Sequence, residues 1–187
     1  MLRGLCLFAL GPVAMVGTLS VGLAADLPPA TGPVILTVSG NIEQTNRPPF
    51  DESEDVLTYF HERSFDKAVE FDRAMLEALG MHEYEVNYEE RPEAILFEGP
   101  RLSDVLELVG AKPTMLTVVA LDLFASEISK EDLGNHEWIV ALKRDGEYLR
   151  LGQHGPVWVV YDPGPDKEIT SEEEATWPWA AFYIEVE

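Results

Sequence analysis

Few side chains in this chain of 187 residues have the types and spacing that catalysis requires. The four histidines, His61, His82, His136 and His154, do not show the spacing of a metal site, and no His-Glu-x-x-His segment occurs. A Gly-x-Ser-x-Gly nucleophile segment and a glycine-rich phosphate loop are also absent from the sequence. The acidic run at 172–174 lacks the spacing of an EF-hand and is interpreted as a solvated loop. We therefore expect no catalytic residues and no metal ligands.

Thiol chemistry depends on Cys6, the only cysteine in the sequence. It lies in an apolar run that has a short basic start and ends in small residues, as a secretory signal peptide does. We predict cleavage after Ala24, with Ala25 as the next choice, which makes 1–24 a signal peptide and 25–187 a soluble periplasmic protein. The alternative is an uncleaved membrane anchor. If the leader is removed, the exported protein has neither a disulfide nor a thiol.

The formal net charge is -21, and removing Arg3 with the leader changes it by one, to -22. A charge this negative argues against nucleic acid and against anionic lipid as partners. It permits a partner protein with a basic surface. The length remaining after the leader suits a single domain with its own core, so residues 25–187 are predicted to form one domain.

The chain is organised around 155–161, Gly-Pro-Val-Trp-Val-Val-Tyr, which predicts a buried strand. Alternating or β-branched patterns predict further strands at 34–40, 67–71, 82–88, 95–97, 115–120, 138–142, 148–151 and 179–186. The residues Arg-Asp-Gly-Glu at 144–147 predict a tight hairpin turn, which is the strongest local signal in the chain.

Helices are expected to be short and few. Asp72 is predicted to cap a helix over 73–79, Ser103 to start a helix that ends at Gly110, and Ser129 to begin a helical turn. The segment 56–63 is interpreted as a short helix or an irregular extended piece, and 162–176 as a long acidic loop. The fold class that follows is α+β, mostly mixed or antiparallel sheet with two or three short helices.

An ordered set of short segments runs through most of the chain after the leader. They are Ser39-Gly40-Asn41-Ile42-Glu43, Phe71-Asp72, Met75-Leu76-Glu77-Ala78-Leu79, Phe97-Glu98-Gly99-Pro100, Asp104-Val105-Leu106, Gly110-Ala111, 120–128, Asp145-Gly146, Gly155-Pro156-Val157-Trp158, Trp179 and Ile184-Glu185-Val186. In this order they resemble the small stand-alone members of the sulfite-oxidase-fold, molybdopterin-binding family. The resemblance implies that fold and a site for a pterin.

Enzymes of that family hold molybdenum through a cysteine thiolate and the two sulfurs of the pterin cofactor. Since residues 25–187 contain no cysteine, cysteine-ligated molybdenum is not expected in the mature chain. The chain then resembles the PruR-like periplasmic pterin-binding proteins, which pass a pterin signal to a membrane-bound diguanylate cyclase/phosphodiesterase. The alternatives are a molybdopterin-cofactor-dependent oxidoreductase or its subunit, and a family member used only as a protein-interaction module.

Pterin binding requires an aromatic wall, an acceptor for the donor edge of the ring and a donor for its oxygen. Asp122, in a loop after a buried strand, is the candidate carboxylate, and its alternative is a turn or cap residue. Arg150 could contact the ring oxygen or a phosphate tail, and its alternative is a surface arginine paired with an acid. His154 could donate to the ligand or be a solvated loop histidine.

Four aromatic residues complete the predicted pterin site. Trp158 and Tyr161 are interpreted as core residues first and as ligand wall second, whereas Tyr88 and Phe124 lie in more loop-like segments. In the family both 120–124 and 150–158 border the pterin. The resemblance therefore predicts that Asp122 and Arg150 point into one cleft walled by Phe124, Trp158 or Tyr161.

Overall fold

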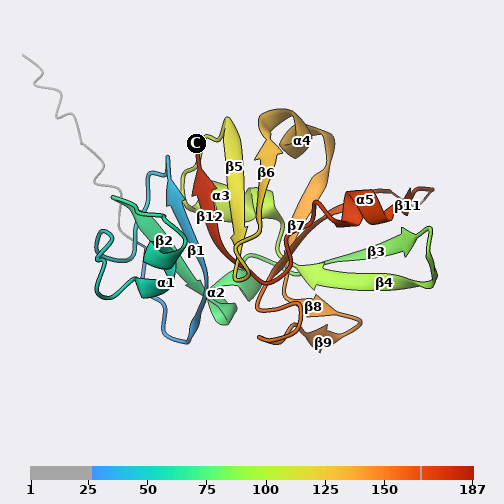
Figure 1. Ribbon diagram of the computed structural model, residues 1–187, viewed down its shortest axis with the longest axis horizontal. Helices are drawn as coiled ribbons and strands as arrows, with labels where there is room; N and C mark the ends of the chain where they lie inside the picture. The colour runs from blue at the N-terminus through green and yellow to red at the C-terminus, as the bar shows by residue number, and fades with distance from the viewer. Residues whose placement is uncertain (1–26, 165) are drawn as a thin grey trace, which may run out of the picture.

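Three β-sheets and five short helices make up the described part of the chain, residues 27–164 and 166–187 of a computed structural model (Figure 1). The predicted signal peptide, 1–24, lies outside the described residues. The α+β class with mixed sheets is confirmed. Each described helix has only four to seven residues, and none is long and apolar enough to span a lipid bilayer.

The first sheet brings the two ends of the described chain together in the order β2-β1-β12-β5-β6. Its strands are β2 (Ala68–Asp72), β1 (Val34–Gly40), β12 (Ala181–Val186), β5 (Met115–Ala120) and β6 (Ala125–Ser129). Strands β1 and β12 pair in parallel, and the other neighbours are antiparallel. Val38 and Ile184 lie opposite each other at the parallel pair, and both are fully buried.

The other two sheets position the aromatic residues. Strands β10 (Trp158–Asp162) and β7 (Glu137–Ala141) form an antiparallel pair in which Tyr161 lies opposite Trp138. The third sheet has the order β11-β3-β4-β8-β9. Its strands are β11 (Glu168–Ile169), β3 (His82–Tyr88), β4 (Arg91–Gly99), β8 (Lys143–Arg144) and β9 (Glu147–Tyr148). The β3–β4 hairpin extends at one end of the molecule, opposite β1 and β2 (Figure 1).

The helices are α1 (Val56–Phe60), α2 (Arg73–Glu77), α3 (Leu102–Leu108), α4 (Lys130–Asn135) and α5 (Ser171–Glu174). Two predicted caps are confirmed: Asp72 accepts from the Met75 N–H at 2.9 Å, and Ser129 accepts from the Asp132 N–H at 3.1 Å. The Asp145-Gly146 turn is also confirmed, because both residues have positive φ, 51° and 79°, as the turn between β8 and β9 requires.

Five sequence-based assignments need correction. The strand predicted at 148–151 is only the two-residue β9, Glu147–Tyr148. The predicted loop 162–176 contains β11 and α5, because Thr170 and Glu173 form a reciprocal capping box. The loop predicted around Asp122 is short, since β6 begins at Ala125 and pairs with β5 from Met115 to Val119. The strand predicted at 95–97 is part of the longer strand β4, which pairs with β3 over most of its length. Helix α3 begins one residue before Ser103, with Arg101 at the cap position.

Candidate functional site

Trp177 is the centre of a buried aromatic cluster that includes two predicted ligand residues. Its ring contacts Tyr161 at a centroid distance of 4.9 Å, and Tyr88 and Phe97 at 6.5 Å each, all edge to face. Phe97 continues the cluster to Trp158 at 5.2 Å. Tyr88, Trp158 and Tyr161 are all buried, and burial raises the pKa of Tyr88. These rings therefore contribute mainly to packing between sheets, as expected for Trp158 and Tyr161.

His154 lies flat on Trp158, with the ring centroids 4.7 Å apart and the planes 10° from parallel. Its outer edge contacts Trp179 at 5.9 Å. Burial, followed by the nearby charge of Arg144, lowers the pKa of His154 below its usual value of 6.5. The imidazole is therefore neutral at neutral pH, and it covers one face of Trp158.

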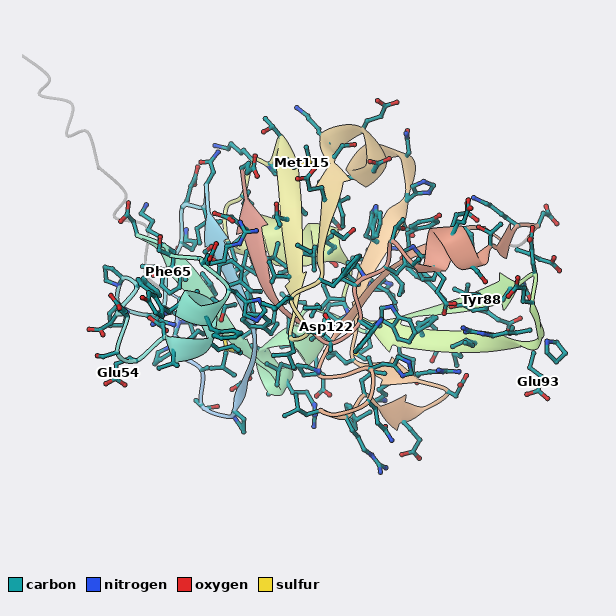
Figure 2. The ribbon with its side chains drawn as sticks, in the orientation of Figure 1. Glu54, Phe65, Tyr88, Glu93, Met115 and Asp122 are labelled. Atoms are coloured by element: carbon teal, nitrogen blue, oxygen red, sulfur yellow. The ribbon has the colours of Figure 1, made fainter. Side chains whose placement is uncertain are left out.

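Asp122 acts as a turn residue in the β5–β6 connection. Its carboxylate accepts from the Phe124 N–H at 3.1 Å, the interaction of an Asx turn, and Leu123 beside it has φ of 75°. Asp122 and Phe124 are both exposed. Figure 2 shows Asp122 near the middle of the molecule and Tyr88 close to the β3–β4 turn.

Arg150 is a surface arginine whose guanidinium lies 3.8 Å from the Glu147 carboxylate. The predicted segments do approach each other, since the Leu121 N–H donates to the Ala180 carbonyl and the Ala180 N–H donates to the His154 carbonyl. The contacts of the two side chains are local: Asp122 closes its own turn, and Arg150 pairs with Glu147 at the surface. Ligand contact by either residue stays a prediction.

An aromatic groove does occur around Tyr161, about 250 Å³ in volume. We call it the Tyr161 groove, and it is lined by Ser126, Glu127, Ile128, Asp132, His136, Trp138, Tyr161 and Thr176. His136 lies on Tyr161 at 4.1 Å and 20°, and Trp138 meets Tyr161 edge to face at 5.0 Å. The groove is formed where β6, α4, β7 and β10 meet. Trp138 and Tyr161 come from the cross-strand pair of β7 and β10, and His136 comes from the C-cap of α4.

Two carboxylates, those of Glu127 and Asp132, are among the polar groups of the Tyr161 groove. Asp132 accepts from the Ser129 hydroxyl at 2.6 Å, whereas Glu127 has no hydrogen-bond partner among the described residues and keeps both oxygens free. Burial raises the pKa of Tyr161, and the charges of Glu173 and Asp132 add to this while Lys167 opposes it. Tyr161 therefore remains a protonated hydroxyl donor at neutral pH.

Sequence reasoning found Tyr161 but missed the residues around it. His136 was considered only as a metal ligand, and Trp138 only as a strand residue. Glu127 lies between the predicted loop after Asp122 and the helical turn at Ser129, and no element is predicted for it, although the alternation of β6 exposes it. One signal points to them, because His136 and Trp138 flank the start of a predicted strand. The register that brings Trp138 opposite Tyr161 is seen only in the structure.

Other hollows fit a flat ring less well. The depression of about 870 Å³ beside α5 is lined by Glu89, Asp166, Glu168, Glu172 and Glu173 but by no aromatic ring. A hollow of about 340 Å³ lies on the other side of His136 and Trp138. No further aromatic ring lines that hollow. Its arginine, Arg101, is paired with Glu137 at 3.3 Å.

The donor set for a metal is weak. Among residues 27–164 and 166–187, no three His, Cys, Asp or Glu side chains are arranged to hold a metal ion. Cys6, the only residue that could supply a thiolate, lies outside the described residues. The described residues therefore do not fit the cysteine-ligated molybdenum of the family's enzymes.

No model of a known protein family matches the chain, and no curated protein matches it. A solved structure does: the sulfane dehydrogenase SoxCD from Paracoccus pantotrophus is similar at 16% sequence identity, with a TM-score of 0.52. The match covers 82% of this chain, but it spans only 38% of the sulfane dehydrogenase chain. At this identity the likeness shows the fold alone, and the predicted sulfite-oxidase-type fold is confirmed.

Proposed function

We propose that this domain is a non-enzymatic binding protein for a small pterin-type heteroaromatic, which it holds in the Tyr161 groove. The observation that carries the proposal is the combination, in one groove, of three aromatic rings with a carboxylate that has no other partner. A flat amino-pyrimidinone ring needs such a combination, since its faces are apolar and its edge carries a pair of N–H donors.

Each group in the groove has a defined role in this proposal. The free carboxylate of Glu127 accepts from the donor edge of the ring, and Asp132 adds negative charge beside it. The hydroxyl of Tyr161, kept protonated by its raised pKa, donates to the ring oxygen. The rings of His136 and Trp138 provide the apolar contact.

The groove favours a pterin without a long tail. Its volume of about 250 Å³ is below the roughly 300–1,000 Å³ of pockets for drug-sized ligands, so it suits a bicyclic ring only. The two carboxylates would repel the phosphate of a complete molybdopterin. The groove also lacks a thiolate for molybdenum. These three features favour a metal-free ligand over the family's cofactor.

A second function is favoured by the fold. The likeness to a sulfane dehydrogenase chain supports a subunit of a molybdopterin-dependent oxidoreductase. In that case a further subunit or segment would supply what the described residues lack. Bound molybdenum in the purified protein would distinguish this function from the first.

The proposal includes a cellular setting. The predicted leader supports a location in the periplasm, and the resemblance to PruR-like proteins supports a membrane-bound diguanylate cyclase/phosphodiesterase as the partner that responds to the ligand. In this setting the chain reports a pterin rather than transforming it.

The test uses two histidines that match each other. His136 lies flat on Tyr161 at the groove, and His154 lies flat on Trp158 away from it; both are half-buried. Calorimetric titration with tetrahydropterin should show binding to the wild type. His136→Ala should weaken it about tenfold through the loss of ring contact, while His154→Ala should bind as the wild type does.

Each opposite result has a defined meaning. Weaker binding in His154→Ala but not in His136→Ala would move the ligand to the site predicted from the sequence. The absence of tetrahydropterin binding in the folded wild type would contradict the proposed function.

A further inference from the structure

Helix α1 has the reverse of the usual amphipathic arrangement. Its apolar residues Val56, Leu57, Tyr59 and Phe60 are exposed, with 61% of Val56 and 69% of Phe60 accessible, whereas Thr58 is its only buried residue. A surface helix in a soluble protein normally buries its apolar stripe and exposes its polar residues. The folded domain therefore leaves the apolar side of α1 without a partner among the described residues.

The exposed helix borders a groove of about 350 Å³, which we call the α1 groove. Leu151 in its lining is 73% accessible, and the apolar lining residues are Val34, Ile35, Leu36, Val56, Leu57, Leu121, Leu151, Pro156 and Phe182. The groove joins α1 to the two loops at 121 and 151–156, which come from distant parts of the sequence. An accessible apolar surface built from separate segments is typical of an interaction site.

The charged residues at the base of the α1 groove satisfy one another. The Arg47 guanidinium contacts the carboxylates of Asp55 and Glu70 at 2.7 Å each. All three side chains are largely buried. An anionic ligand would find no free positive partner there, since Arg47 is already paired twice, so the groove suits an apolar occupant.

The surroundings of the α1 groove are strongly acidic. Asp51, Glu52, Glu54, Glu62 and Asp66 are exposed on the segments that flank α1, and none forms an ion pair with the described residues. Figure 2 shows Glu54 at the end of the molecule opposite Glu93 and the β3–β4 turn. This end therefore presents an apolar centre with unpaired carboxylates at its rim.

We propose that the α1 groove docks a segment of another protein that presents apolar side chains flanked by lysine or arginine. The negative charge of the carboxylates at the rim favours a partner that carries positive side chains beside its apolar ones. A second copy of this chain, or an anionic membrane, would bring like charges within about 10 Å, where they repel. The proposal stands whether or not the Tyr161 groove binds a pterin, because the two grooves share no lining residue.

Three designed peptides test the chemistry of the occupant. The first is an amphipathic helix of leucine and lysine, the second replaces each lysine by glutamate, and the third replaces each leucine by serine. Fluorescence anisotropy should show binding of the leucine–lysine peptide only, because the proposed surface requires both apolar contact and positive charge. Equal binding of the serine–lysine peptide would overturn the proposal, since charge alone would then be sufficient.

Variants locate the binding. The double variant Val56→Ser and Leu151→Ser changes two groove residues that are already mostly exposed, so the fold should be kept. It should bind the leucine–lysine peptide about tenfold more weakly. The control Tyr148→Ser changes an exposed residue outside the groove, the aromatic side chain on β9, and should bind as the wild type does. Equal weakening in the control would overturn the assignment to the α1 groove.

Two matched pairs of carboxylate substitutions test the role of the acidic rim. Glu54→Gln with Glu62→Gln should weaken peptide binding and its dependence on salt, whereas Glu168→Gln with Glu172→Gln, near α5, should not. Sedimentation of the protein alone and flotation with anionic phosphatidylglycerol vesicles test the other occupants. A dimer, or vesicle binding, that is abolished in the double groove variant would overturn the proposal in favour of a second copy or a membrane.

Discussion

Asp122 and Glu127 lie on the same hairpin, but the structure gives the two carboxylates different partners. Asp122 accepts a backbone N–H of its own turn, while Glu127 borders the Tyr161 groove with both oxygens free. A charge-assisted hydrogen bond contributes about 1.5–3 kcal/mol, so Glu127→Gln should weaken tetrahydropterin binding by one to two powers of ten. Calorimetric titration measures the change.

The comparison variant is Asp122→Asn, which has the same loss of charge and is expected to keep wild-type affinity. If Asp122→Asn weakens binding and Glu127→Gln does not, the site predicted from the sequence is right and the groove assignment is wrong.

His154 makes stability depend on pH in a defined direction. Its pKa in the folded protein is below 6.5 because of burial, so the unfolded chain binds more protons in mildly acidic solution. Its contribution to stability is therefore present above about pH 6.5 and is lost as the pH falls below that value. We expect urea unfolding of the wild type to show a drop in stability between about pH 7 and pH 5.5 that is smaller in His154→Gln.

His61 changes stability with pH in the same direction, because burial and then the charge of Arg63 lower its pKa, while the charge of Asp122 partly opposes them. The drop should thus be reduced in His154→Gln but not removed. An unchanged pH dependence in this variant would contradict the inferred burial of the imidazole.

At the level of elements, Asp72 connects the start of the described chain to α2. One carboxylate oxygen accepts from the N–H groups of Thr31 and Gly32 at 2.9 and 2.7 Å, and the other caps the helix at Met75. Asp72→Ala should lower the midpoint of thermal unfolding by several degrees, because three backbone donors lose their acceptor. The matched change Thr170→Ala, which removes the cap of the exposed helix α5, should have a smaller effect; equal effects would contradict this account.

Trp177 connects the third sheet to the β7–β10 pair through its contacts with Tyr88, Phe97 and Tyr161. It is 1% exposed, so Trp177→Ala leaves a large cavity and should lower the free energy of unfolding by about 3–5 kcal/mol. Trp179, two residues on, is 41% exposed, and Trp179→Ala should cost about 1 kcal/mol or less. Chemical denaturation of both variants checks the difference, and similar losses would argue against Trp177 as the centre of the cluster.

Short sequence patterns predicted the elements that are stabilised by residues close in the sequence. The caps at Asp72 and Ser129, the Asp145-Gly146 turn and the buried strand after Pro156 follow from neighbouring residues, and the structure confirms them. Strands β6 and β11 could not be predicted in this way, because their stability comes from pairing with β5 and β3, which are distant in sequence.

The same distinction applies to the candidate site. Tyr161 was predicted from a conspicuous apolar run, but its partners depend on the register of β7 against β10 and on the position of α4. No short-range pattern contains that register. Asp122 was selected because it follows a buried strand, which is also where turn residues occur, and the structure shows the turn.

At the scale of the whole molecule, the two proposed surfaces lie on different elements. The Tyr161 groove is formed by β6, α4, β7 and β10, and the α1 groove lies beside β1 at the end opposite the β3–β4 hairpin (Figure 1). Ligand and partner could therefore bind at the same time. Such an arrangement suits a protein that reports a bound ligand to another protein, as we propose.

The measurement that tests the central claim most directly is mass spectrometry of the small molecules released from protein purified from its native host, with metal analysis of the same sample. The account predicts a pterin in near-stoichiometric amount and no molybdenum. Stoichiometric molybdenum would contradict it and favour the oxidoreductase subunit, and a protein that releases no pterin and binds none on titration would contradict ligand binding altogether.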